Sequence, residues 1–450
     1  MPNLQNKITD CTAHIAVVGL GYVGLPLATA FAKAGFRVTG LDISQHKVNS
    51  IAAGKSYIPD VLESDLAPHV QSGIITATSD YDALCEVDAI FICVPTPYDA
   101  QRAPDLSFIQ DASAGIEPRL KPGQLIVLQS TTYPGTTEEI VQPILEQSGL
   151  RAGMDFYLAF SPERIDPGNK KWSAYNTPKV VGGITPKGTQ LACDLLSQMG
   201  ALVHPVSSTR AAELTKLLEN TFRAVNIALV NELSLLTERM DIDFWEVIKA
   251  AETKPFGFMP FYPGPGVGGH CIPIDPYYLS WKAREYDYYT EFIELAGEVN
   301  QAMPHHVVEL VSQALSMHRK PLRDARVLIL GVAFKPEIDD ARNSPAGRII
   351  ELLLNRGAEV YYHDPYVPRF QVGNDVFHRE ATILESVALT EKEIAAADCV
   401  VIVTDHRRLD YERVAVHANL VVDTRNATAD LSDYRDKIVR LGTPLVFPEK

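Results

Sequence analysis

One arrangement of residues occurs twice in this 450-residue chain, and it limits the folds that the chain can adopt. Residues 14–42 read as an apolar strand, a glycine turn, a helix and a second strand that ends in Asp42, which is one βαβ unit. Residues 326–364 repeat the scheme, with Gly331 after the first strand and Asp364 after the second. The correspondence continues in residues 89–96 and 399–406, and in residues 125–131 and 420–426. We therefore predict an α/β protein with two Rossmann-like, doubly wound parallel-sheet domains, one at each end.

A long helix is predicted between the two repeats. From Ser207 the chain runs for more than thirty residues without Gly or Pro, and hydroxyl side chains stand at its start as capping candidates. Such a helix is roughly 45 to 50 Å long at 1.5 Å per residue. It is either a plain connector or a spine that also provides a dimer contact. At ~150 residues per domain the chain divides into three domains, which we place at residues 1–206, 207–318 and 319–450.

Composition excludes several classes of protein. A net charge of -15 argues against nucleic acid as the main partner. No run of roughly 18 uncharged apolar residues is present, so we expect no membrane span; residues 15–32 are broken by glycines and read as core, not as a signal peptide. The six cysteines lack C-x-x-C spacing, and His305 and His306 are adjacent on a predicted helix. We therefore expect a cytoplasmic protein without disulfides and without a metal site.

A dinucleotide site is predicted at the first glycine turn. The pattern G-x-G-x-x-G follows a predicted strand and opens a helix, a context that makes this short motif informative. The first glycine permits the tight turn, the second admits a pyrophosphate, and the third lets helix and strand pack closely. Asp42 would accept hydrogen bonds from an adenosine ribose and repel a 2′-phosphate, which favours NAD over NADP. The cofactor residues at the turn are Gly19, Gly21, Tyr22, Val23, Gly24 and Asp42.

Two threonines follow later predicted strands. Thr96 and Thr131 lie at the carboxyl ends of their strands, where doubly wound sheets bind ligands. Either side chain could contact the cofactor or a catalytic water. The alternative is that each hydroxyl caps a turn.

A reactive cysteine is predicted in residues 261–279, FYPGPGVGGHCIPIDPYYL. Cys271 is neither in an apolar strand nor near another cysteine, and the glycine-rich loop before it lets backbone approach a ligand. Beside a nicotinamide, a thiolate can attack an aldehyde to form a thiohemiacetal, which a second hydride transfer converts to a thioester. Water then releases a carboxylate, so a primary alcohol is oxidised in two steps and two NAD are reduced. We expect Tyr262 and Gly268 of this loop to contact the substrate.

Polar groups for this chemistry are predicted on the long helix and after a strand. Lys216 and Asn220 are four residues apart and share one helical face, which is either a catalytic pair or a solvated surface. Glu163 follows the predicted strand YLAF and is either an acid or base for thioester hydrolysis or part of a surface ion pair.

Taken together, the motifs resemble those of the UDP-glucose and UDP-N-acetylhexosamine 6-dehydrogenase family, in order over nearly the whole chain. They are the glycine motif with Asp42, STTYPGTT, SPER, K-x-x-x-N, GGHCIPIDP, GVAFKPEIDDARNSP and DTRN. The resemblance implies that Cys271 is the nucleophile, that Lys216, Asn220 and Asp275 position water and stabilise the oxyanion, and that Thr131 and Glu163 assist. It also implies a dimer through the central region and UDP binding by the C-terminal domain.

The resemblance also assigns cations to the ligands. Lys335 and Arg425 match residues that contact the substrate, and Arg342 matches one that reaches the cofactor. Lys and Arg form the strong, charge-assisted hydrogen bonds that a diphosphate needs. Lys47, five residues after Asp42, is expected on the adenosine side.

Two departures concern the sugar. UDP-glucose members of the family usually have a lysine where this chain has Ile274, and a second glutamate where it has Pro167. With residues 254–283, these departures resemble the UDP-N-acetylglucosamine branch, whose product would be the uronate, a precursor of surface polysaccharide in bacteria or archaea. The same reaction on UDP-N-acetylmannosamine, UDP-glucose or GDP-mannose stays open. Two hypotheses of a different kind are a metal-dependent alcohol dehydrogenase, which lacks clustered ligands here, and a sensor that binds nucleotide-sugar or NAD without turnover.

Overall fold

The computed structural model describes residues 3–58, 60–98, 103–165, 171–173, 175–373 and 381–445. The chain folds into two compact units. The first comprises Met1–Glu219 and Trp281–Tyr288, and the second comprises Asn220–Ser280 and Tyr289–Lys450.

The first unit contains an eight-stranded sheet in the order β3-β2-β1-β4-β5-β6-β7-β8. Neighbouring strands are parallel from β3 to β6, β7 is antiparallel to β6, and β8 is parallel to β7. The strands are β1 His14–Val18, β2 Arg37–Leu41, β3 Ile75–Thr78, β4 Ala89–Ile92, β5 Leu125–Leu128, β6 Tyr157–Phe160, β7 Lys179–Gly183 and β8 Val203–Pro205. The antiparallel step at β7 differs from the fully parallel sheet that the sequence patterns predict.

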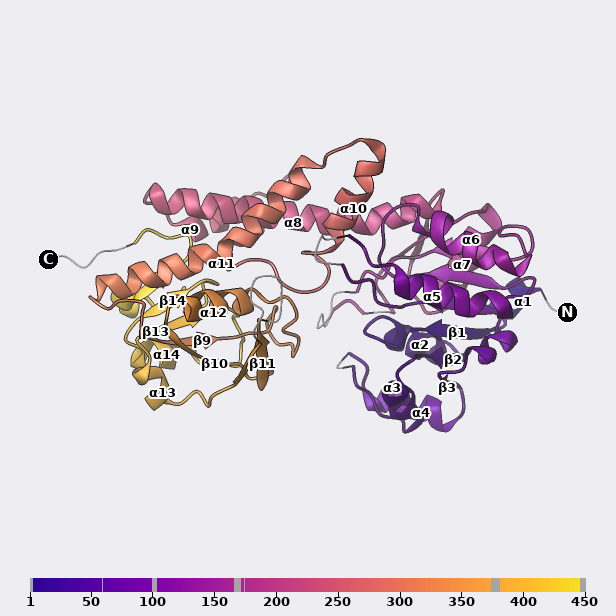
Figure 1. Ribbon diagram of the computed structural model, residues 1–450, viewed down its shortest axis with the longest axis horizontal. Coiled ribbons are helices and arrows are strands. Elements are labelled where there is room, and N and C mark those ends of the chain that lie inside the picture. The colour runs from indigo at the N-terminus through magenta and orange to yellow at the C-terminus, as the bar shows by residue number, and fades with distance from the viewer. Residues whose placement is uncertain are drawn as a thin grey trace. The chain divides into compact units, whose positions relative to one another are not determined.

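Helices surround this sheet because its strands are apolar on both faces. Strands β4 and β5 are buried along their whole length, as near-continuous apolar runs in a covered parallel sheet should be. Figure 1 shows the helices around the strands. They are α1 Leu4–Thr9, α2 Gly24–Lys33, α3 Gln45–Ala52, α4 Glu63–Gln71, α5 Ser107–Ile116, α6 Gln142–Leu145 and α7 Pro186–Ser197.

The second unit contains a five-stranded, fully parallel sheet in the order β10-β9-β13-β14-β15. The order of its first four strands reproduces β2-β1-β4-β5 of the first unit, so the predicted repeat of the fold is confirmed. The strands are β9 Arg326–Leu330, β10 Glu359–His363, β13 Cys399–Ile402, β14 Val421–Asp423 and β15 Ile438–Arg440. A separate antiparallel pair consists of β11 Arg369–Val372 and β12 Thr382–Glu385.

Alternate residues of these strands face two different layers of helices. Val327 and Ile329 of β9 pack with α11 Glu291–Met317 and α12 Pro345–Asn355. Leu328 and Leu330 of the same strand pack with α13 Glu391–Ala396 and α14 Tyr411–His417. Figure 1 shows the strands between these helices. The sheet is therefore doubly wound, as predicted.

The predicted long helix is α8, Thr209–Arg239, which has 31 residues and hence a length of about 46 Å at 1.5 Å per residue. Its residues up to Glu219 belong to the first unit, and the rest belong to the second. The remaining helices of the second unit are α9 Phe244–Ala251 and most of α10 Asp275–Ala283. No helix among the described residues is long and apolar enough to span a membrane.

Candidate active site

The glycine turn after β1 has the geometry that its motif predicts. Gly19 has a φ of +92°, and a Cβ there would lie 2.6 Å from the carbonyl oxygen of Cys93. A Cβ on Gly24 would lie 1.8 Å from the carbonyl oxygen of Gly19, so only glycine lets α2 begin this close to the strand. A Cβ on Gly21 would meet no atom within 4 Å. Gly21 therefore borders open space at the start of α2, beside Tyr22 and Val23, where a pyrophosphate can approach the backbone.

Asp42 ties the end of β2 to this turn. Its Oδ2 accepts the N–H of Leu20 at 2.8 Å and the Nζ of Lys47 at 2.9 Å, and its Oδ1 accepts the N–H of Ser44 at 2.9 Å. A carboxylate has about four acceptor sites. Asp42 and Lys47, both predicted for the adenosine side, are thus brought together as an ion pair.

Lys216 and Thr131, two of the predicted catalytic residues, are also brought together. The Nζ of Lys216 on α8 donates to the Oγ1 of Thr131 at 2.5 Å. Thr131 lies just after β5, whereas Thr96 lies after β4 and takes no part in this contact. The ammonium group thus fixes the threonine hydroxyl.

A second contact from α8, which was not predicted from the sequence, holds the residues after Thr131. Glu213 accepts the N–H of Gly135 at 2.6 Å, the N–H of Thr137 at 2.9 Å and the hydroxyl of Thr137 at 2.7 Å. Glu213 is fully buried, and burial raises the pKa of its carboxyl group. Its spacing from Lys216 was the available signal, since residues three apart share a helical face.

Glu163, predicted as an acid, a base or a surface partner, is instead the centre of a buried cluster. Both of its oxygens accept the Nζ of Lys179, at 3.0 and 2.9 Å. Oε2 also accepts from Gln129 at 2.8 Å, and Oε1 accepts the backbone N–H groups of Arg164 and Ile165. The ion pair with Lys179 is buried at both ends, so the surface interpretation is wrong.

The same segment is tied to α8 by its next residue. The Arg164 guanidinium donates to both oxygens of Glu219, at 3.1 and 2.5 Å, and to the carbonyl oxygen of Pro178. Bidentate pairs of this kind are strong and fix orientation. Residues 161–165 are thereby held from two sides. Pro167, which bears on the choice of sugar, lies outside the described residues.

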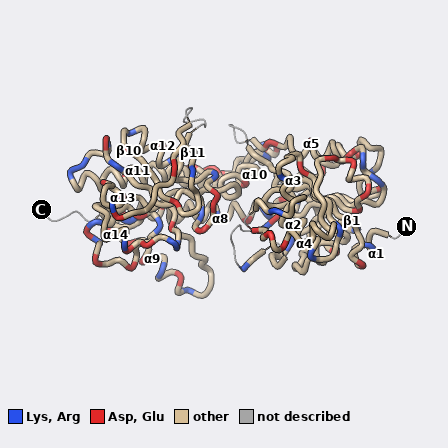
Figure 2. Tube along the Cα trace, turned by 90° about the horizontal axis from the view of Figure 1, so that it is seen from below, with Lys and Arg blue, Asp and Glu red and all other residues tan. Residues whose placement is uncertain are grey.

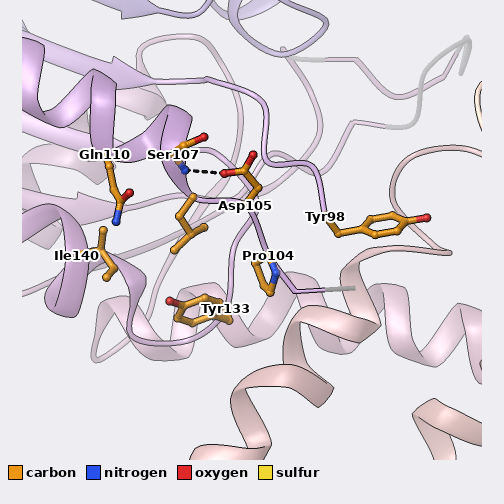
Figure 3. A pocket seen from close by; sticks show the side chains of 8 residues that line it. Tyr98, Pro104, Asp105, Ser107, Gln110, Tyr133 and Ile140 are labelled. Atoms are coloured by element: carbon orange, nitrogen blue, oxygen red, sulfur yellow. Dashed lines mark hydrogen bonds between the residues drawn. The ribbon is translucent and has the colours of Figure 1, made fainter. Parts of the chain in front are cut away.

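A pocket of about 450 Å³ lies beside the segment that follows Thr131. Figure 3 shows Tyr133 at its edge, with Asp105 accepting the N–H of Ser107 at 2.9 Å at the start of α5. The other lining residues are Tyr98, Pro104, Leu106, Gln110 and Ile140.

In the second unit, Asp275, four residues after Cys271, forms a polar pair with Asn220 of α8. The Nδ2 of Asn220 donates to the Oδ2 of Asp275 at 2.6 Å, and both side chains are buried. The carbonyl oxygen of Cys271 accepts the N–H of Asp275 at 2.8 Å and that of Ile274 at 3.0 Å. The cysteine therefore stands in the turn that precedes α10, where it is partly exposed and forms no disulfide. Of the predicted catalytic residues, the structure thus joins Asn220 of α8 to Asp275, and the N–H of Asp275 donates to the backbone of Cys271.

The glycines before Cys271 are explained by packing. A Cβ on Gly268 would lie 2.8 Å from the Cβ of Phe334 and 2.9 Å from Pro345. Gly269 has a φ of +88°, and its added Cβ would touch the Phe334 ring. Gly268 was predicted to contact substrate; its position also requires glycine because the segment after β9 packs against it.

Arg342 lies beside the same loop. Its carbonyl oxygen accepts the N–H of Gly269 at 3.1 Å, and its guanidinium donates to the Nδ1 of His270 at 3.4 Å and to both oxygens of Asp340. Burial opposes ionisation of Asp340, but the hydrogen bonds from Arg342 hold the pKa of its carboxyl below the usual value. The Arg342 guanidinium, which was predicted to reach the cofactor, is therefore paired with Asp340 in this structure.

The residues predicted to bind substrate lie in both units: Glu163 and Lys216 in the first, and Asn220, Tyr262, Gly268, Lys335 and Arg425 in the second. Arg425 follows β14 and pairs with Asp405 at 3.1 Å, and Lys335 lies in the segment after β9. A Cβ on Gly264 would lie 2.5 Å from Nη1 of Arg425, so the glycine-rich loop reaches this arginine. Tyr262 donates to Glu252 and stacks on Trp245. In Figure 2 the charged positions of both signs are interspersed along the described parts of each unit.

Comparison with known proteins gives one family for all parts of the chain. Residues 13–199 match the NAD binding domain of the UDP-glucose/GDP-mannose dehydrogenase family, residues 210–302 its central domain, and residues 328–430 its UDP binding domain. The UDP-N-acetyl-D-glucosamine 6-dehydrogenase of Pseudomonas aeruginosa is 41% identical over 355 residues, 78% of this chain and 83% of the relative. The UDP-N-acetyl-D-mannosamine dehydrogenase of Escherichia coli K12 is 35% identical, over 92% of this chain and 98% of the relative.

A solved structure agrees with these matches. The UDP-N-acetyl-D-mannosamine dehydrogenase from Pyrococcus horikoshii superposes with a TM-score of 0.85 at 33% identity, covering 95% of this chain and 99% of the other. The chain therefore belongs to the UDP-glucose/GDP-mannose dehydrogenase family and is an NAD-dependent UDP-sugar dehydrogenase.

Proposed function

We propose that this enzyme oxidises the C6 alcohol of UDP-N-acetylglucosamine to the carboxylate in two NAD-dependent steps, through adducts on Cys271. The observation that carries the mechanism is a partly exposed Cys271 one turn before α10, whose carbonyl oxygen accepts the N–H of Asp275, a member of the buried Asn220–Asp275 pair. Bound NAD supplies the hydride acceptor for each oxidation. A second oxidation of the same kind needs a tetrahedral carbon that bears both a hydrogen and a hydroxyl group, and addition of the thiol to the aldehyde provides one.

Atoms and electrons balance at each step. The alcohol loses a hydride and a proton to become an aldehyde, and the Cys271 thiol adds across its carbonyl group to give a thiohemiacetal. Loss of a second hydride and proton gives a thioester, and water cleaves its C–S bond to release the carboxylate and restore the thiol. Asp275 orients the amide of Asn220, so that Asn220 stabilises the oxyanion. Lys216 lies one turn from Asn220 on α8 and, together with Thr131, positions the water that attacks the thioester.

The choice of sugar rests on three supports. The relative that is 41% identical carries the name UDP-N-acetyl-D-glucosamine 6-dehydrogenase, and Ile274 and Pro167 replace the residues usual for UDP-glucose enzymes. The second candidate is UDP-N-acetylmannosamine, the sugar in the names of relatives that are 35% identical to this chain.

The test is the number of NADH formed per sugar consumed, for native enzyme and for Cys271→Ser, with UDP-N-acetylglucosamine, UDP-N-acetylmannosamine and UDP-glucose. Two NADH per UDP-N-acetylglucosamine, and a kcat that collapses in Cys271→Ser, are expected. One NADH per sugar, or an unaffected variant, would refute the covalent route. If kcat/KM is at least tenfold higher with UDP-N-acetylmannosamine than with UDP-N-acetylglucosamine, the substrate assignment changes to UDP-N-acetylmannosamine and the mechanism stands.

We further propose that the three parts of the chain divide the work: residues 1–206 bind NAD, 207–318 carry the cysteine loop, and 319–450 bind UDP. A homodimer through the central part is supported by exposed apolar side chains along one face of α8, namely Leu218, Phe222, Leu229 and Leu236. Light scattering after size exclusion should give twice the chain mass for native enzyme and one chain mass for Leu229→Glu.

The six cysteines, which form no disulfide, favour the cytoplasm as the compartment of this enzyme.

A further inference from the structure

The second unit contains a buried Asp364–His406 pair that the proposed reaction does not use. Asp364 follows β10 and His406 follows β13, and neither side chain is exposed. The Nε2 of His406 lies 3.1 Å from the Oδ2 of Asp364, and the N–H of Glu337 donates to Nδ1 at 3.1 Å. Since Nδ1 accepts, Nε2 must carry the proton and donate it to Asp364. His406 thus bridges the carboxylate of Asp364 and the backbone of Glu337.

Asp364 and His406 hold the two ends of one short segment, residues 332–337. Oδ2 of Asp364 accepts the N–H of Val332 at 2.7 Å and that of Ala333 at 3.0 Å. Burial opposes ionisation of Asp364, but its hydrogen bonds from His406 and the backbone hold the pKa below the usual value. The carboxylate therefore fixes the start of the segment, and the imidazole fixes its end.

The end of the segment needs this support because its backbone is strained. Glu337 has a φ of +66°, which costs of order 1 kcal/mol or more for a residue with a Cβ. Besides the bond to His406, the side chain of Glu337 accepts the hydroxyl of Tyr366 at 3.0 Å and the N–H of Arg407 at 2.8 Å. Such a conformation persists only where surrounding contacts determine it.

The held segment carries two residues that bear on the reaction. Lys335 is a predicted substrate contact, and Phe334 packs against Gly268 and Gly269 of the loop before Cys271. The Phe334 ring also meets the His270 ring edge to face, at 6.5 Å between centroids. A displacement of residues 332–337 would therefore move both the proposed nucleotide contact and the support of the cysteine loop.

We propose that His406 is a positioning residue: by holding residues 332–337 it sets Lys335 for the nucleotide of the substrate and supports the loop that presents Cys271. The inference rests on the proposed roles of Lys335 and Cys271. No atom of His406 has to touch the substrate.

The test compares two polar replacements of different reach. In His406→Gln the side-chain amide can still donate to Asp364 and accept from Glu337, whereas in His406→Asn it is too short to reach both. Dissociation constants for UDP and for NAD are measured by calorimetry on the full-length protein. Alkylation of Cys271 by iodoacetamide is followed by mass spectrometry, with the exposed Cys85 as internal reference.

Expected results for His406→Asn are a UDP dissociation constant raised at least tenfold, a Cys271 alkylation rate changed at least threefold relative to Cys85, and unchanged NAD binding. His406→Gln should stay within threefold of native enzyme in each quantity. His417→Asn, at the end of α14, is the matched control and should behave as native. Equal values for His406→Asn and native enzyme, or an equal loss of UDP and NAD binding, would overturn the inference.

Lys335→Ala separates this inference from the function on which it rests. If Lys335→Ala leaves the UDP dissociation constant unchanged, the proposed role of Lys335 fails, whatever the His406 variants do. If Lys335→Ala weakens UDP binding and His406→Asn does not, the role of His406 is refuted while the proposed function stands.

Discussion

Replacement of Lys179 by methionine should destabilise the first unit by about 3 kcal/mol. The ammonium group contacts both oxygens of Glu163 and is fully buried. Breaking a buried ion pair costs ~3–5 kcal/mol because the remaining charge loses its partner. The lower end applies here, since Gln129 and the N–H groups of Arg164 and Ile165 still donate to the carboxylate. At roughly 2–4 °C per kcal/mol, the midpoint of thermal unfolding should fall by roughly 6–12 °C.

The double variant Lys179→Met with Glu163→Gln removes both charges and should recover most of this loss. Calorimetric unfolding of native enzyme, both single variants and the double variant forms a cycle, and we expect a coupling free energy of ~2 kcal/mol or more. Purely additive losses would refute the claim that the pair acts as a unit. The cycle also tests the role of Glu163. If the double variant regains stability but not activity, Glu163 takes part in the chemistry. If activity returns together with stability, the Glu163–Lys179 pair only positions residues 161–165.

Three further predictions follow from the glycine turn and the two strand-end carboxylates. Gly24→Ala should destabilise the first unit or abolish NAD binding, because its Cβ would lie 1.8 Å from the carbonyl oxygen of Gly19. Gly21→Ala should have the same unfolding midpoint as native enzyme but bind NAD at least tenfold more weakly. Calorimetry of both variants measures the unfolding midpoint and the NAD dissociation constant. Because the pKa of Asp364 is lowered in the folded state, its contribution to stability is present above the unfolded value of ~3.9 and is lost as pH falls through the lower folded value. Unfolding midpoints measured between pH 3 and 7 should therefore drop less steeply in Asp364→Asn, and equal slopes would contradict this. NAD at 100 times its dissociation constant should stabilise native enzyme by about 2.7 kcal/mol, and Asp42→Ala should show a smaller increase in the unfolding midpoint at the same NAD concentration.

Local patterns were enough to predict the fold of both sheets and of α8. Apolar runs, glycine turns and a stretch without Gly or Pro are local signals, and strand order follows once two βαβ units are recognised. The antiparallel strand β7 was not predicted because nothing local to residues 179–183 records the direction of its neighbour. Strand direction is decided by packing over long separations.

The site was predicted less completely, for a similar reason. Cys271 and Asp275 stand in an unusual loop, and the spacing of Lys216 and Asn220 is visible on a helix. Lys179, in contrast, reads in sequence as an ordinary surface lysine; it lies in β7, and its partner Glu163 stands sixteen positions earlier, after β6. Buried polar partners of this kind become visible only when the fold brings the segments together.

The carboxylates of the two repeats show why a repeated fold does not imply a repeated ligand. Asp42 and Asp364 both follow the second strand of their βαβ unit and accept backbone N–H groups from the turn after the first strand. The remaining partner differs: Asp42 pairs with Lys47, whose side chain is 35% exposed, whereas Asp364 pairs with His406, whose side chain is 0% exposed. A ribose can displace an exposed lysine at small cost, but it cannot displace an imidazole that is enclosed on all sides and bonded through both nitrogens. We therefore expect a dinucleotide to reach the carboxylate of the first repeat by displacing Lys47, whereas the equivalent carboxylate of the second repeat shapes its own loop, so function must be argued from the partners of each residue.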